Sequence, residues 1–292
     1  MRMRVLFLII FLFSFWSCKL SKNNSIECPI AISGEEWELD LNFSDEFNAQ
    51  KINSNIWETD IDAWGIRSWS KECVEQHDGI LSLSMVYDEH EPKDIKYFYK
   101  MGIVRSHHKT TYGYYEARIK GASVFPGVCP AFWLYSSGEE MVIANDTITY
   151  SEIDIVELTM GEDDGTTVST IDCNLHMRLR KGNKEIWQRP NTHPNLCKTF
   201  FEADWDPRED YHIYGCENRE DSVVFYIDNK RIGAKKNYYW HLPMNLTFTM
   251  EPRKPHHRYT GKDGREPVPE AATKEGFPTY MKIDWVRVWK QK

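Results

Sequence analysis

The stretch that decides the fold is residues 151–158, which read Ser151-Glu152-Ile153-Asp154-Ile155-Val156-Glu157-Leu158. Acids alternate here with β-branched residues, and this period of two predicts a β-strand. In such a strand the side chains of Glu152 and Asp154 share one face and Ile153 takes the other. Glu157 lies five positions after Glu152 and would point away from it unless a β-bulge within Ile155-Val156 adds one residue. With that bulge, three carboxyl groups line one face.

Paired carboxyl groups on one face suit hydrolysis of a glycosidic bond. One ionised carboxylate attacks the anomeric carbon, and one protonated carboxyl assists the leaving oxygen. Like charges held close together raise at least one pKa, which keeps a proton available near neutral pH. Because the acids come from one strand, we expect the separation of roughly 5 Å that accompanies retention of configuration. The alternative is a solvated strand face whose acids have no catalytic role.

Strand-like patterns recur along the chain, for example at residues 80–86, 97–119, 131–135, 171–180 and 281–289. No amphipathic stretch of helical length interrupts them, and no internal repeat or linker divides them. A chain of 292 residues can bury a large core in one domain. The sequence therefore predicts an all-β fold, an antiparallel β-sandwich.

The N-terminus has the features of a targeting segment. Arg2 and Arg4 precede an apolar stretch, 5–13, that is too short to span a bilayer. Ser17 followed by Cys18 resembles a bacterial lipoprotein signal, in which Cys18 carries the lipid. We expect a signal peptide over 1–17, a tether over 18–34 and one catalytic domain over 35–292. The exported protein would then be anchored by lipid to the outer membrane or cell surface; an ordinary secretory signal is the alternative.

The amino-acid composition limits the classes of molecule that this protein is expected to bind. The net charge of −8 argues against a general nucleic-acid binder, because no basic excess is available to neutralise phosphates. The 11 Trp and 15 Tyr can fill a sandwich core or stack on sugar rings. Six cysteines follow Cys18, which permits up to three disulfides, with free buried thiols as the alternative. None of them shows metal-ligand spacing.

The pattern Glu152-x-Asp154-x-x-Glu157 resembles the bulged signature of glycoside hydrolase family 16. In that family the first Glu is the nucleophile, the Asp assists it, and the last Glu is the acid/base. The resemblance covers about Trp37 to Trp289 and is strongest to the κ-carrageenase branch, through residues 64–69, 112–133, 150–151, 187–190, 206–208, 239–241 and 275–279. It implies a jelly-roll, concanavalin-like sandwich with an open substrate cleft, and a retaining endo-hydrolase that cleaves β-1,4 bonds of sulfated red-algal galactan.

Three arginines are expected to bind sulfate or its sugar, because the planar guanidinium matches sulfate oxygens. Arg67, Arg189 and Arg253 match arginines of the carrageenase pattern, and the latter two are sulfate contacts there. The alternative for each is an ion pair with one of the many surface acids. Glu251-Pro252 replaces the Gly-Leu that usually precedes the last arginine, and residues 261–274 are unusually charged, which leaves the sulfation pattern open.

Aromatic residues and one histidine complete the expected substrate site. Trp133 is the candidate stacking platform before the cleaved bond, with core packing as the alternative. His176 is expected near the acid/base residue, with a hydrogen-bonded core histidine as the alternative. Three further tryptophans are weaker candidates for substrate contact: Trp64, Trp187 and Trp240.

Several readings remain open. Within the enzyme class they are a furcellaran-type or hybrid carrageenan specificity, a porphyran or agarose hydrolase, and a laminarinase, which the arginines disfavour. Outside it, the chain could be a surface glycan-binding lipoprotein without catalysis. We expect a monomer that needs no cofactor; the resemblance leaves room for a structural calcium ion, although no acidic cluster identifies its ligands.

Overall fold

The computed structural model describes residues 26–92, 95–158, 161, 165–261 and 264–292. The expected signal peptide, Cys18 and most of the tether lie outside these residues. Among the described residues, no helix combines the length and apolar character needed to cross a membrane.

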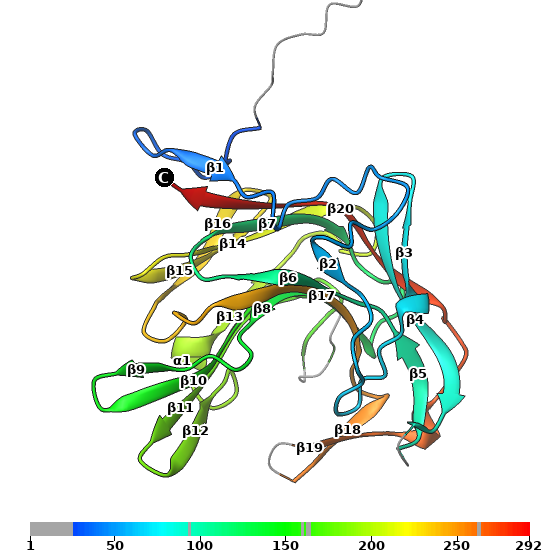
Figure 1. The fold of residues 1–292 in the computed structure, drawn as a ribbon. Helices are drawn as coiled ribbons and strands as arrows, with labels where there is room; N and C mark the ends of the chain where they lie inside the picture. Colours follow the sequence, from blue (N-terminus) through cyan, green and yellow to red (C-terminus); the bar gives the residue numbers. More distant parts are fainter. Residues whose placement is uncertain (1–25, 93–94, 159–160, 162–164, 262–263) are drawn as a thin grey trace, which may run out of the picture.

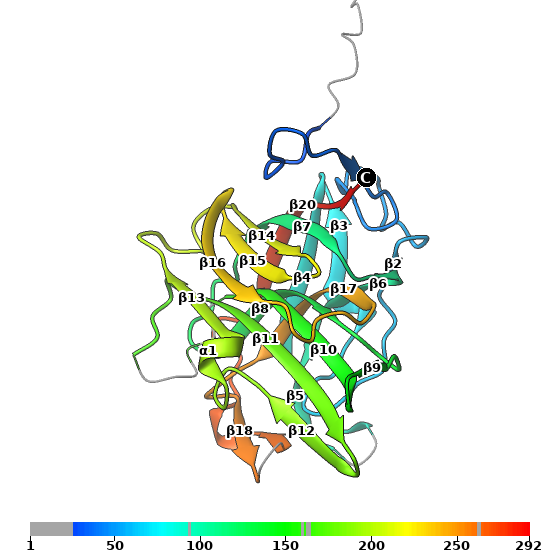
Figure 2. The same cartoon turned by 90° about the vertical axis from the view of Figure 1, so that its left-hand side faces the viewer.

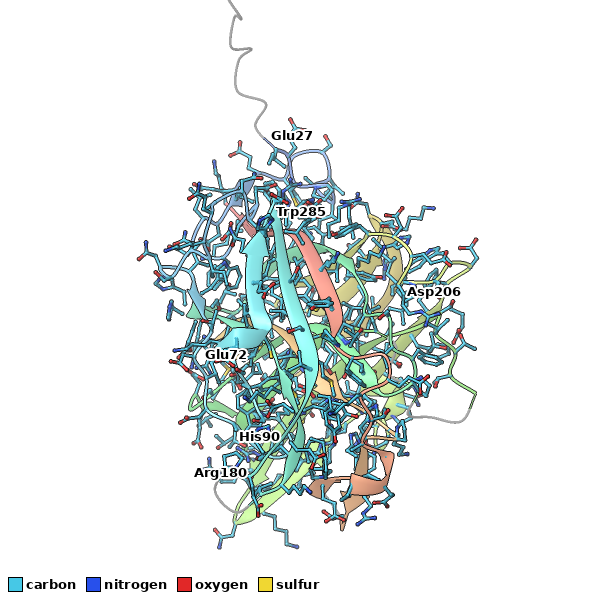
Figure 3. The ribbon with its side chains drawn as sticks, turned by 90° about the vertical axis from the view of Figure 1, so that its right-hand side faces the viewer. Glu27, Glu72, His90, Arg180, Asp206 and Trp285 are labelled. Carbon is cyan, nitrogen blue, oxygen red and sulfur yellow. The ribbon has the colours of Figure 1, made fainter. Side chains whose placement is uncertain are left out.

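Two nine-stranded antiparallel sheets lie one over the other (Figure 1). The outer sheet has the order β16 (Lys230–Lys236), β15 (Ser222–Ile227), β14 (His212–Asn218), β7 (Gly113–Lys120), β20 (Thr279–Gln291), β4 (Ile80–His90) and β3 (Val74–His77). β1 (Trp37–Leu39) pairs with β20, and β5 (Tyr97–Met101) pairs with β4. Figure 3 shows this sheet from its β3–β4 edge, with the labelled Trp285 on β20 behind it.

The second sheet, here called the cleft sheet, has the order β12 (Lys184–Gln188), β11 (Thr170–Lys181), β10 (Asp146–Glu157), β8 (Val128–Tyr135), β17 (Met244–Pro252), β6 (Ile103–Thr110) and β2 (Trp57–Glu58). β13 (Lys198–Glu202) pairs with β11, and β9 (Met141–Ile143) pairs with β10. A hairpin of β18 (His257–Thr260) and β19 (Gly264–Pro267) lies apart from both sheets at the bottom of Figure 1.

Helical structure is limited to short segments in the described part of the chain. They include α1 (Pro194–Cys197), which lies beside β11 and β13 in Figure 2, and single 3-10 turns at Lys71–Cys73 and Pro269–Ala271. The expected all-β sandwich is confirmed. Its strands carry the alternation seen in the sequence, because each sheet has one face against the other sheet.

The core lies between the sheets. Ile153, Leu134 and Leu246 of the cleft sheet are fully buried in one cluster with Ile119 and Ile283 of the outer sheet. All six cysteines from Cys28 to Cys216 are buried and free, so the alternative of free thiols is the correct one.

Candidate active site

A β-bulge in β10 brings the three acids together, as the sequence predicted. Against β8 the register passes from Asp154 opposite Trp133 to Val156 opposite Phe132, so Ile155 is the extra residue. Ile155 and Val156 are both buried in the core, at 1% and 0% exposure. Two successive inward side chains reverse the alternation. Glu157 therefore returns to the face of Glu152 and Asp154.

All three carboxyl groups line a cleft of about 630 Å³. Its floor comes from β8, β10 and β11, and the end of β17 forms part of a wall. One wall is formed by β12 and the segment after it, up to Asn191, and another by the segment Gly65–Arg67. The β18–β19 hairpin adds Tyr259 and Arg265. The sandwich thus carries one cleft in which the three acids lie beside cationic and aromatic side chains.

Glu152 and Asp154 share one histidine. His176 Nε2 lies 3.1 Å from Asp154 Oδ2 and 3.7 Å from Glu152 Oε1. The Tyr150 hydroxyl donates to the other oxygen of Glu152. Burial lowers the pKa of His176, but the charges of Glu152 and Asp154 outweigh burial and raise that pKa to about 9. The imidazole therefore carries a positive charge at neutral pH and offsets part of the acids' mutual repulsion.

Asp154 is the most enclosed of the three acids, with 5% exposure. Burial raises its pKa well above the ordinary value, and the charges of Glu152 and Glu157 add to the effect. His176 acts in the opposite direction. Burial and the like charges therefore favour the protonated form of Asp154, whereas the imidazole of His176 favours the ionised form.

Glu157 has different partners, on the other side of the bulge. Asn174 Nδ2 donates to Glu157 Oε2 at 3.2 Å, and Arg253 Nη2 donates to Glu157 Oε1 at 2.8 Å. Asn174 lies opposite Asp154 in the β10–β11 register, two residues before His176. The sequence reasoning did not assign Asn174 or Tyr150 to the site. The period of two could have identified both residues. Tyr150 is two residues before Glu152 and Asn174 is two residues before His176, so each shares a strand face with a predicted site residue.

A second buried acid lies between two of the predicted arginines. Glu251 Oε2 accepts from Arg253 Nη1 at 2.9 Å and lies 2.7 Å from Arg67 Nη2. Burial alone would raise the pKa of Glu251, but Arg67 and Arg253 lower it to about 2. Arg67 and Arg253 do line the cleft, and both are ion-paired there. The sequence left two alternatives for these arginines, a substrate contact or an ion pair with an acid. Because both arginines line the cleft and are also ion-paired, the two alternatives do not exclude each other.

Aromatic side chains and Arg189 supply the remaining contacts of the cleft. Trp133 lines it, lies against Tyr135 with ring centroids 4.7 Å apart, and donates its indole N–H to Thr249 Oγ1 at 3.1 Å. Trp187 lines it from β12, with the Arg189 guanidinium 4.1 Å from its ring centroid. These anchors hold flat apolar surfaces at the edge of the acidic centre, the arrangement on which sugar rings stack.

One expected substrate contact, Trp240, is wrong in this structure, and another, Trp64, stays a prediction. Trp240 is 0% exposed and packs in the core, where its indole N–H lies 2.9 Å from the carbonyl oxygen of Glu152 and 3.1 Å from that of His176. Trp64 is half-buried, packs edge to face on Trp69, and is absent from the described lining of the cleft. Core packing, the commonest fate of a Trp, applies to Trp240, and Trp64 is only partly buried against the core.

The donor atoms of Glu152, Asp154 and His176 lie within 4.8 Å of one another, a set that could hold a metal ion. His176 Nε2 already faces Asp154 here, and hydrolysis by two carboxyl groups requires no metal. The structural calcium ion stays a prediction.

Comparisons with known proteins agree with this geometry. Residues 37–291 match the family model described as beta-porphyranase A-D, GH16 domain. The kappa-carrageenase of Pseudoalteromonas carrageenovora is 36% identical over 281 residues, which cover 92% of this chain and 69% of that protein. The crystal structure of that enzyme with an oligotetrasaccharide of kappa-carrageenan has a TM-score of 0.85 at 35% identity, covering 92% of this chain and 100% of the other. A kappa-carrageenase of Zobellia galactanivorans has a TM-score of 0.81 at 32% identity, with 90% and 98% covered.

Proposed function

The chain belongs to glycoside hydrolase family 16, and on that basis we propose that it is a retaining endo-hydrolase that cleaves β-1,4 galactosidic bonds in sulfated red-algal galactan. The substrate is κ-carrageenan or a furcellaran-type hybrid. The observation that carries this proposal is the bulge at Ile155, which turns Glu157 onto the face of Glu152 and Asp154 in one cleft.

The roles are those that the family signature Glu152-x-Asp154-x-x-Glu157 assigns to each acid. Glu152 attacks the anomeric carbon as Glu157 gives its proton to the leaving oxygen, which breaks the glycosidic bond and leaves a covalent glycosyl-enzyme ester. Glu157 then takes a proton from water, and the resulting hydroxide attacks the ester and frees Glu152. Asp154 lies 3.1 Å from His176 Nε2, and the two together adjust the charge on Glu152, whose Oε1 lies 3.7 Å from the same nitrogen. Two inversions at one carbon retain its configuration.

The cations of the cleft support a sulfated substrate. The chain has a net charge of −8, yet Arg189, Lys254 and Arg265 line the cleft in addition to Arg67 and Arg253, whose charges are paired with Glu251 and Glu157. Cations gathered in one groove of an acidic protein raise the local concentration of an anionic ligand. The similarity to kappa-carrageenases across 92% of the chain points to the same class of polymer.

A porphyran hydrolase is the second candidate, because the matching family model is described by porphyranases. The bond class and the mechanism would be the same, and the polymer would differ. Agarose and laminarin are less consistent with the cationic cleft, since neither requires an anion site. A glycan-binding protein without catalysis would not need the proton donor that the bulge supplies.

Export belongs to the same proposal, since algal polysaccharide is too large to enter the cell intact. Arg2, Arg4, the apolar stretch and Ser17-Cys18 support a lipoprotein of the cell surface. Metabolic labelling with a fatty-acid analogue tests this: wild type would be labelled and Cys18→Ala would not. An unlabelled wild type would leave the ordinary secretory signal.

The function is tested by release of reducing ends from κ-carrageenan, furcellaran, ι-carrageenan, porphyran, agarose and laminarin, with Glu152→Gln as the matched control. We expect turnover of κ-carrageenan or furcellaran that the variant lacks. Turnover of porphyran alone would favour the second candidate. Turnover of laminarin alone, or equal turnover in the variant, would contradict the proposal.

A further inference from the structure

Glu251 is enclosed in the wall of the cleft. It lies in β17, one residue before the strand ends, and is 4% exposed. One carboxylate oxygen, Oε2, meets Arg67 Nη2 at 2.7 Å and Arg253 Nη1 at 2.9 Å. Arg67 comes from a distant loop, so the carboxylate joins two parts of the wall. Buried charges of this kind persist because they are paired.

The charges in this part of the cleft are balanced by the protein itself. Arg253, also 4% exposed, directs Nη1 to Glu251 and Nη2 to Glu157. The guanidinium charges of Arg67 and Arg253 thus face the carboxylates of Glu251 and Glu157. The lowered pKa of Glu251 is consistent with an ionised side chain at neutral pH.

We propose that Glu251 is a specificity-determining residue whose carboxylate fills the anion position between Arg67 and Arg253, so that the galactose unit bound there carries no sulfate. A sulfate at that position would have to displace Glu251 or lie beside its charge in a site with little water, and like charges in such a site oppose binding strongly. The inference rests on the proposed function. It makes a galactan with both sulfated and unsulfated galactose units the preferred substrate.

Sulfate on other units can bind farther along the same cleft. Arg265 of β19 lines it, and Nη1 of Arg265 has no hydrogen-bond partner among the described residues. Its guanidinium carbon lies 5.2 Å from the centroid of the Tyr259 ring. The cleft therefore has two different positions. At Arg67 and Arg253 the cationic charges are paired with Glu251 and Glu157, whereas Arg265 supplies a cationic position.

The variant Glu251→Gln tests the inference, because it keeps the shape and removes one negative charge. We measure kcat/KM on κ-carrageenan, in which the galactose units are sulfated, and on furcellaran, in which only part of them are. Wild type should prefer furcellaran. In Glu251→Gln the ratio of κ-carrageenan to furcellaran kcat/KM should rise at least about tenfold, the scale on which like charges in a desolvated site act.

Glu266→Gln is the matched control, since it makes the same charge change at a half-buried acid of β19 that pairs with Arg258 outside the described cleft lining. Its ratio should equal that of wild type. Should Glu251→Gln fail to fold, Arg67→Gln tests the same balance from the other side, because it leaves more negative charge at the position. The ratio should then fall several-fold.

The outcomes separate the two proposals. A wild type that turns over no galactan contradicts the proposed function. A wild type that turns over galactan but prefers κ-carrageenan, or a Glu251→Gln ratio equal to that of wild type, overturns the role of Glu251 alone. An equal loss on both polymers would assign Glu251 to support of the wall without selection.

Discussion

His176 directs Nε2 to Asp154, at 3.1 Å, although its partner in the β10–β11 register is Glu152, whose Oε1 is 3.7 Å away. The histidine therefore lies diagonally across two strands and between two carboxylates. This leaves one oxygen of Glu152 facing Tyr150 and the other within reach of the imidazole. Glu152 of β10 thus has the Tyr150 hydroxyl at one carboxylate oxygen and the cationic imidazole of His176 near the other.

The first prediction concerns pH. A pKa of His176 raised from its ordinary value of 6.5 to about 9 contributes stability that is complete below pH 6.5 and is lost as pH rises through 9. The unfolding free energy of wild type should exceed that of His176→Gln by at most about 3 kcal/mol at low pH, and the difference should vanish above pH 9. Denaturant unfolding across pH 5.5–10, in steps of about half a unit, measures it.

The control is His193→Gln, since His193 bonds the neutral hydroxyl of Thr192 and lies outside the described cleft lining. A difference between wild type and His176→Gln that is the same at every pH would contradict a charged His176.

The second prediction separates the roles of the two glutamates. Glu157→Ala should lose about 10²- to 10⁴-fold in kcat, the usual contribution of a general acid/base. Added azide should restore turnover and yield a β-glycosyl azide, because azide attacks the glycosyl-enzyme ester that Glu152 forms. Glu152→Ala with azide should instead yield the α-product. NMR of the products reads the anomer, and exchanged outcomes would reverse the assignment.

The third prediction concerns Trp240, whose indole N–H donates to backbone carbonyl oxygens of β10 and β11. Trp240→Phe leaves two buried carbonyl oxygens without this donor and should lower the unfolding free energy by about 1–3 kcal/mol. It should also lower kcat more than it changes KM, because the backbone of Glu152 shifts. The control is Trp285→Phe on β20, half-buried in the outer sheet. An unchanged kcat in a destabilised variant would limit Trp240 to packing.

The fourth prediction concerns the thiols. All six described cysteines are free, and burial raises the pKa of Cys28 and of Cys197 to about 12 each. The thiolate is the reactive form, so a thiol reagent at pH 8 should leave them unmodified until the chain unfolds. The melting temperature should be the same with and without reductant. A lower melting temperature in reductant would indicate a disulfide.

Much of the site could be predicted from residues 151–158 alone. The period of two assigns Glu152 and Asp154 to one face, and the odd spacing of Glu157 requires an extra residue if it is to join them. The shared face of Glu152 and Asp154 and the extra residue before Glu157 are local properties of one strand. Pairing with the neighbouring strands changed neither of them. The all-β architecture follows in the same way from the recurrence of alternating runs.

The fate of the tryptophans was decided only by the tertiary structure. Trp133 and Trp240 are equally aromatic and both come from strand-rich segments, yet one lines the cleft and the other is enclosed beneath β10 and β11. The contact of Glu251 with Arg67, and the free state of the cysteines, also depend on segments far apart in the chain. Periodicity says which side chains share a face of one strand. Which faces are covered, and by what, depends on long-range pairing of strands, which no local pattern encodes.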